Sequence, residues 1–113
     1  MQEMQEMEST VMELIIHAGE ARSSSMQALL AARKHNWQEA DALLASARDA
    51  AREAHKIQTA LIGADEGCGK IPVNLIMVHA QDHLMNAMLC RDLVEELIYL
   101  HRQVQALSKT HVQ

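Results

Sequence analysis

The sequence is poor in aromatic residues, proline and glycine. Its 113 residues include no phenylalanine, one tryptophan, one tyrosine, one proline and four glycines, whereas 49% of the residues are hydrophobic. Alanine and leucine are abundant instead. A chain of this length forms a single domain, and this composition is typical of an all-α fold.

Further absences disfavour several kinds of protein. The two cysteines, Cys68 and Cys90, form no CxxC pair and are too few for a disulfide framework, and no signal-peptide pattern opens the sequence. The apolar runs are a few residues long, far short of the ~20 that a membrane span requires. The formal net charge of −5 disfavours nucleic acid as a partner. We therefore expect a cytoplasmic protein that neither inserts into the membrane nor binds nucleic acid.

Apolar residues at three- and four-residue spacing predict three long helices. They cover about residues 6–34, 37–62 and 74–105, and the third is expected to begin between residues 72 and 74. Three helices of ~40 Å each bury surface poorly for their size. A single copy of such a bundle therefore has little core for its length.

The connections and the ends of the chain are less regular. Asn36 and Glu39 have the spacing of a variant capping box, which predicts the start of the second helix. Three of the four glycines lie in residues 63–70, so this segment is the predicted loop. Residues 1–7 are predicted to form a flexible N-terminal tail and residues 106–113 a polar C-terminal tail.

The third helix carries apolar residues on more than one face. We expect one set to face the core of the bundle: Leu75, Leu89, Leu93 and Leu97. A second set projects in other directions: Ile76, Leu84, Met88, Val94 and Ile98. A single three-helix bundle would leave part of this surface in water, which predicts a homo-oligomer. The alternative is a tight monomeric core in which methionines fill the gaps.

Three ionisable side chains share the first of these stripes. His79, Asp82 and His83 fall within an arc of roughly 100° on a helical wheel. Burying such groups without partners costs several kcal/mol, so the sequence predicts either a hydrogen-bonded network or a chemical site at this place.

The spacing alone leaves three interpretations of these residues open. His79 and His83 are four residues apart and could share a metal ion, with Asp82 adding an oxygen ligand, in a metal-binding helical bundle. His79 could instead be a nucleophile that accepts a phosphoryl group, since it lies close to the glycine-rich loop and has a neighbour that can orient it. The third interpretation is a pair of structural histidines in a purely structural oligomerisation module.

A family resemblance favours the second interpretation. Residues 78–85, with the sequence VHAQDHLM, closely resemble the active-site signature of the lactose/cellobiose (chitobiose) class of enzyme IIA, the phosphocarrier of the bacterial sugar phosphotransferase system. Residues 18–23 (AGEARS) and residues 54–59, which contain Ala-His and Gln-Thr, extend the likeness over nearly the whole chain.

The resemblance implies an assembly and a chemistry. The assembly is a homotrimer of antiparallel three-helix bundles, forming a nine-helix bundle with the third helices about the threefold axis. His79 would become a tele-phosphohistidine, receiving the phosphoryl group from HPr and passing it to the IIB component of a permease whose membrane part is IIC. The chain would thus be a phosphotransferase component.

The resemblance also implies roles for the neighbours of His79. Asp82 would lie near the axis, where three copies bind a divalent cation such as Mg²⁺, and His83 would supply a supporting hydrogen bond. Gln81 lies about 160° from His79 on the helical wheel and is expected to contact a neighbouring subunit or the solvent. His17 and His55 are interpreted as packing or surface residues.

Overall fold

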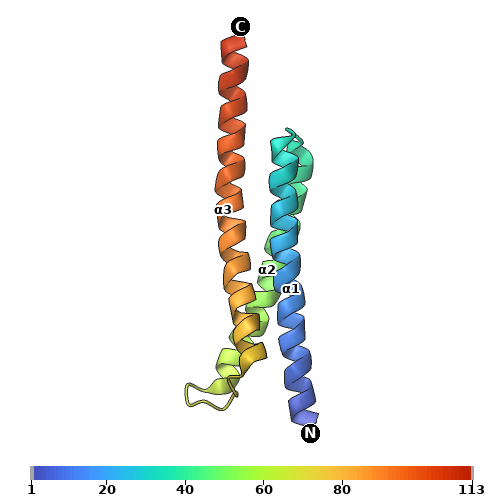
Figure 1. The fold of residues 1–113 in the computed structure, drawn as a ribbon, viewed down its shortest axis with the longest axis vertical. Coiled ribbons are helices and arrows are strands. Elements are labelled where there is room, and N and C mark those ends of the chain that lie inside the picture. The colour runs from blue at the N-terminus through green and yellow to red at the C-terminus, as the bar shows by residue number, and fades with distance from the viewer. Residues whose placement is uncertain (1, 113) are drawn as a thin grey trace.

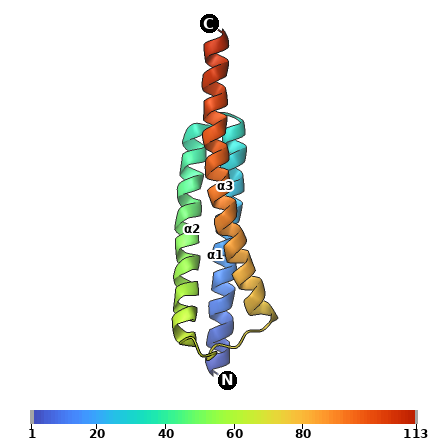
Figure 2. The same ribbon diagram turned by 90° about the vertical axis from the view of Figure 1, so that its left-hand side faces the viewer.

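The computed structural model describes the backbone of residues 2–112 and the side chains of residues 5–108. It contains three α-helices: α1 (Gln2–Arg33), α2 (Trp37–Asp65) and α3 (Leu75–Val112). The helices run antiparallel in a bundle of 68 × 22 × 19 Å, and α3 extends well beyond the turn between α1 and α2 (Figures 1 and 2). No strand occurs in residues 2–112, so the all-α prediction is confirmed.

The helices are longer than predicted at both ends of the chain. α1 includes residues 2–7, which we expected to form a flexible tail, and α3 continues through residues 106–112, which we expected to form a polar tail. α2 ends at Asp65 instead of about residue 62.

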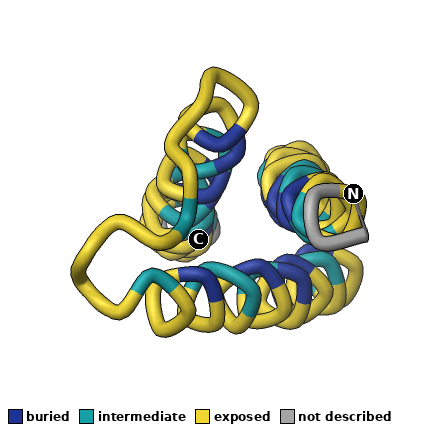
Figure 3. The backbone as a smooth tube through the Cα atoms, turned by 90° about the horizontal axis from the view of Figure 1, so that it is seen from below, coloured by how far each residue is buried: buried dark blue, intermediate teal, exposed yellow. Residues whose placement is uncertain are grey.

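Alanine dominates the core of the bundle. Buried residues on all three helices face the space between them (Figure 3). Most of the buried positions of α1 and α2 are alanines, and α3 contributes Ala80 and Ala87 to the same core. Because a methyl group fills little space, two helices that meet through alanines approach closely. The core is therefore narrow, with few large side chains inside it.

The predicted orientation of α3 within a single bundle is wrong. Leu84, Val94 and Ile98, which we expected to point away from the core, are buried with 3% exposure or less. The leucines that we expected inside are exposed: Leu75 by 85%, Leu89 by 57%, Leu93 by 54% and Leu97 by 43%. The buried face of α3 combines Ala80 and Ala87 with larger side chains that pack against the alanines of α1 and α2: Met77, Leu84, Val94 and Ile98. The exposed leucines, with Leu100 and Val104 beyond them, form what we call the α3 apolar stripe.

In the turn between α1 and α2, backbone hydrogen bonds close the end of α1, and Asn36 precedes the start of α2. His35 has a φ of 62°, and the amides of His35 and Asn36 donate to Ala32 O and Ala31 O at 3.0 and 2.9 Å, the pattern of a Schellman motif. Asn36 precedes α2 but makes no side-chain cap; its Nδ2 donates to Glu39 Oε2 at 3.1 Å. The predicted start of the second helix is therefore confirmed, with Asn36 as the N-cap of α2, but the expected side-chain hydrogen bond to the helix backbone is absent.

Trp37 ties this turn to α3. Its Nε1 donates to Gln105 Oε1 at 2.8 Å, and the guanidinium carbon of Arg102 lies 5.0 Å from the ring centroid, in the range of a cation–π interaction. Arg102 Nη2 also pairs with Asp41 Oδ1 at 2.6 Å. These contacts hold α3 against the hairpin formed by α1 and α2.

The loop between α2 and α3 is organised by two side chains. The carboxylate of Asp65 accepts hydrogen bonds from Ile71 N at 3.0 Å and Gly69 N at 3.4 Å. Asn74 Oδ1 accepts from Met77 N at 3.0 Å and so caps the first turn of α3. This loop fixes where α3 begins and, one turn later, where His79 lies.

Candidate functional site

A hollow between α1 and α3 brings the predicted site residues together. His79, Asp82 and His83 line it from α3, and its volume is about 330 Å³. Asn86, also on α3, and Arg22 on α1 complete the lining. His79 lies at the border between the buried face of α3 and the α3 apolar stripe, because Ala80 next to it is fully buried while Asp82 is exposed.

The two histidines form a contacting pair. Their ring centroids are 4.5 Å apart and the ring planes make an angle of 80°, an edge-to-face arrangement. His79 is exposed and His83 is half-buried. The His79 ring is accessible to another molecule, while the less exposed His83 ring packs against it from the same helix.

Asp82 is held by its own helix. Its Oδ1 accepts a hydrogen bond from Asn86 Nδ2 at 3.0 Å, and no side chain among residues 5–108 donates to its second oxygen. The carboxylate lies in the line of the α3 apolar stripe, between Leu75 and Leu89. Together with Asn86 and His79 it forms a polar patch within this exposed stripe of leucines.

The sequence alone left two possibilities for Arg22, which precedes a run of serines: a place at the rim of the site, or a segment where two helices approach closely. Arg22 brings its guanidinium to the hollow from the facing helix. The signal available was its place in residues 18–23, one of the segments that carry the family resemblance. Its neighbour Ser25 turns inward instead: it is fully buried and its Oγ donates to Ala21 O at 2.7 Å.

Three polar residues considered from the sequence lie outside the hollow. Gln81 faces α2, where its Oε1 accepts from Gln58 Nε2 at 2.6 Å. His17 lies on α1 with its Nδ1 3.8 Å from Glu20 Oε2. His55 lies on α2, in a different groove of the molecule.

The interpretation as a metal-binding bundle finds no support in a single chain. Within the described residues there is no group of three or more histidine, cysteine, aspartate or glutamate side chains placed to hold a metal ion. Although His79, Asp82 and His83 share one hollow, they do not converge on a common point.

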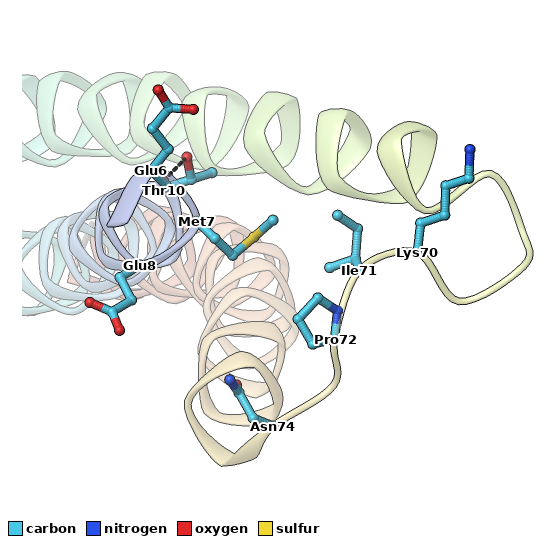
Figure 4. A pocket seen from close by; sticks show the side chains of 8 residues that line it. All are labelled: Glu6, Met7, Glu8, Thr10, Lys70, Ile71, Pro72 and Asn74. Carbon is cyan, nitrogen blue, oxygen red and sulfur yellow. Dashed lines mark hydrogen bonds between the residues drawn. The ribbon is translucent and has the colours of Figure 1, made fainter. Parts of the chain in front are cut away.

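A larger hollow, of about 520 Å³, lies near the N-terminus between α1 and the loop before α3. Its centre is formed by Met7, Ile71 and Pro72, while the carboxylates of Glu6 and Glu8 point away from it (Figure 4). Thr10, Lys70 and Asn74 complete the described part of the lining, and none of the predicted site residues lies in it.

None of the helices in the described part of the chain is both long enough and apolar enough to cross a bilayer. This agrees with the short apolar runs of the sequence.

Comparison with known proteins identifies the family. The profile described as "PTS system, Lactose/Cellobiose specific IIA subunit" matches residues 9–102. The N,N'-diacetylchitobiose-specific EIIA component of Escherichia coli K12 is 48% identical over 104 residues, which cover 92% of this chain and 90% of that protein.

Solved structures agree with the sequence comparison. The cellobiose-specific enzyme IIA of Bacillus anthracis superposes with a TM-score of 0.84 at 38% identity, covering 88% of this chain and 91% of that one. The IIA(chitobiose)–HPr complex of Escherichia coli gives a TM-score of 0.76 at 47% identity, covering 87% of this chain and 95% of that one. The chain therefore belongs to the lactose/cellobiose-specific IIA family of the phosphotransferase system.

Proposed function

We propose that this chain accepts a phosphoryl group on His79 and passes it on, as the IIA phosphocarrier of a chitobiose-, cellobiose- or lactose-type sugar phosphotransferase system. The observation that carries this proposal is the exposed His79 ring at a hollow that also holds His83 and the guanidinium of Arg22. An imidazole nitrogen of His79 attacks the donor's phosphorus, the bond to phosphorus in the donor breaks, and a phosphohistidine forms. Incubation with phosphoenolpyruvate, enzyme I and HPr, followed by intact mass measurement, tests it directly.

The proposed partners are HPr as donor and the IIB component as acceptor, and through IIB the IIC permease. The similarity to the IIA chain of a IIA–HPr complex supports the donor. The proposed acceptor follows from the role of the family. We propose that the transfer takes place in the cytoplasm. The direction of transfer is from HPr through His79 to IIB.

Arg22 is proposed to bind the phosphoryl group during transfer. A guanidinium forms charge-assisted hydrogen bonds to phosphate oxygens and counters the charge that spreads over them in the transition state. Since Arg22 comes from α1 and His79 from α3, the phosphoryl group would be held between two helices.

We expect Arg22→Gln to slow phosphorylation by HPr about 10- to 100-fold, because one charged hydrogen-bond donor is lost from the transition state. Arg22→Lys should recover part of the rate, since it restores the charge but not the two-pronged geometry. Rapid-quench measurement of phosphohistidine formation gives these rates. Arg33→Gln, an exposed arginine in the last turn of α1, is the matched control. Equal rates for wild type and Arg22→Gln would remove Arg22 from the site.

His83 is proposed to orient the His79 ring or to support the bound phosphoryl group. We expect His83→Ala to slow transfer, because the edge-to-face contact at 4.5 Å is lost, while His79 remains the labelled residue. Peptide mapping of the phosphorylated protein checks this. A wild-type protein labelled on His83 would reverse the two roles.

The proposed assembly is a homotrimer in which the third helices meet at the threefold axis. The α3 apolar stripe supports it, because exposed leucines at three- and four-residue spacing form a surface suited to packing against copies of itself. Asp82 lies in this stripe and would bring three carboxylates together.

A divalent cation at the axis, Mg²⁺ in our proposal, fits the oxygen donors of Asp82. Carboxylate oxygens are ligands that Mg²⁺ prefers, and the second oxygen of Asp82 receives no hydrogen bond from residues 5–108. Bound there, the cation would offset the mutual repulsion of three carboxylates.

A further inference from the structure

A groove between α2 and α3 is lined by basic side chains. Arg48, Arg52 and Lys56 come from α2 and Arg91 from α3, and the groove has a volume of about 360 Å³. It lies away from the candidate phosphorylation site, because Met88 in its lining is nine residues beyond His79, which corresponds to a rotation of about 180° on the helix. The family function described above makes no use of this groove.

The charge of the groove contrasts with that of the whole chain. The formal net charge is −5, yet the described residues that line the groove include no carboxylate. Among residues 5–108, neither Arg48 nor Arg52 has an ion-pair partner. The positive charge of these two arginines is therefore available to a ligand.

The other two cations are only weakly compensated. Lys56 pairs with Glu53 at 3.2 Å on the exposed surface, where such pairs contribute little. Arg91 has a side chain that is only 15% exposed; its terminal nitrogens lie 3.5 and 3.7 Å from carboxylates of its own helix. Its Nε is buried and has no hydrogen-bond acceptor.

The spacing of the basic residues indicates the shape of the ligand. Arg48, Arg52 and Lys56 recur every four residues and so form a ridge about 12 Å long. A single phosphate would contact only part of that length. Carboxylates at four-residue spacing on another helix would match it along its whole length.

The floor of the groove is apolar. Ala51 and Met88 are the apolar residues in its lining, which also includes His55, and methionine adapts well to irregular apolar partners. A fully hydrated ion gains nothing from such a floor, whereas an apolar side chain of a partner helix would be buried on it.

We propose that this groove binds an acidic amphipathic helix of a partner protein. Its carboxylates pair with Arg48 and Arg52 and its apolar residue covers Met88. A membrane surface fits less well, because a flat layer of lipid headgroups would cover the basic ridge of α2 without filling the groove beside Ala51 and Met88.

The test uses the full chain and a synthetic helical peptide with glutamates at four-residue spacing beside a row of leucines. Its control is a peptide of the same composition in scrambled order. We expect the helical peptide to shift the Met88 methyl resonance, with an affinity that falls as salt rises. Arg52→Glu should weaken binding by about tenfold or more. Arg33→Glu, a charge reversal of another exposed helical arginine, should leave it within about twofold.

Four results would each overturn the proposal. The first two are no binding of the helical peptide and equal binding of the scrambled peptide. The third is a Met88 resonance that does not respond to the peptide because a neighbouring copy of the chain covers the groove. The fourth is Arg52-dependent binding of phosphatidylglycerol vesicles or of inorganic phosphate alone. Peptide binding should persist in His79→Gln, which separates this proposal from the phosphocarrier function.

Discussion

Replacing His79 with glutamine is expected to abolish phosphoryl acceptance completely while leaving the bundle folded. Glutamine has similar bulk and can hydrogen-bond, but its amide is not a nucleophile. The exposed position of His79 means that the core does not depend on it. Intact mass after incubation with phosphoenolpyruvate, enzyme I and HPr measures the effect, and circular dichroism checks the fold.

The wild-type label provides the control for this experiment. Phosphohistidine is labile in acid, so the added mass should disappear after mild acid treatment. A His79→Gln protein that still gains one phosphoryl group would refute the assignment of His79. A wild-type label that survives acid would indicate phosphoserine instead.

Replacing Asp82 with leucine is expected to give a trimer that no longer depends on divalent metal. In the proposed assembly three copies of Asp82 meet near the axis, where their mutual repulsion requires a shared cation or a proton. Leucine would continue the α3 apolar stripe and remove this repulsion, which should stabilise the trimer by about 1–4 kcal/mol. Sedimentation velocity with magnesium and with a chelator compares the two proteins.

Asp49→Leu on the outer face of α2 is the matched control, since Asp49 is equally exposed but lies far from the stripe. It should keep the metal dependence of the wild type. Either of two results would disprove the axial position of Asp82. One is a wild-type protein that is monomeric at micromolar concentration with magnesium. The other is an Asp82→Leu variant that dissociates while the wild-type trimer is unaffected by the chelator.

The existence and order of the helices could be predicted because apolar periodicity and the glycine-rich loop are local signals. The orientation of α3 could not, because both of its faces are apolar and only the partner helices decide between them. The face with Ala80, Leu84 and Ala87 is the one buried in the bundle, and Leu89 and Leu93 lie outside it. The excess apolar surface on α3 was predicted, but Leu84, Val94 and Ile98, which were expected to contribute to it, are buried in the bundle.

The cluster of His79, Asp82 and His83 could be predicted because the three residues share one helix, so their spacing fixes their neighbourhood. Arg22 could not be assigned in the same way, since its contribution depends on how α1 lies against α3. The same limit applies to the basic groove, in which Arg48 and Arg91 come from different helices. Both the role of Arg22 and the basic groove depend on residues from two helices, and the sequence alone does not show which residues of different helices meet.

The alanine core also influences the distance between the two helices that form the phosphorylation site. Arg22 follows the buried Ala21 on α1, and His79 precedes the buried Ala80 on α3; both alanines belong to one core cluster. A small buried side chain next to each functional residue allows α1 and α3 to lie close together. A valine at position 80 would push the two helices apart and widen the gap between the guanidinium and the imidazole without touching either functional side chain. The position of Arg22 relative to His79 therefore depends on buried alanines that take no part in the chemistry.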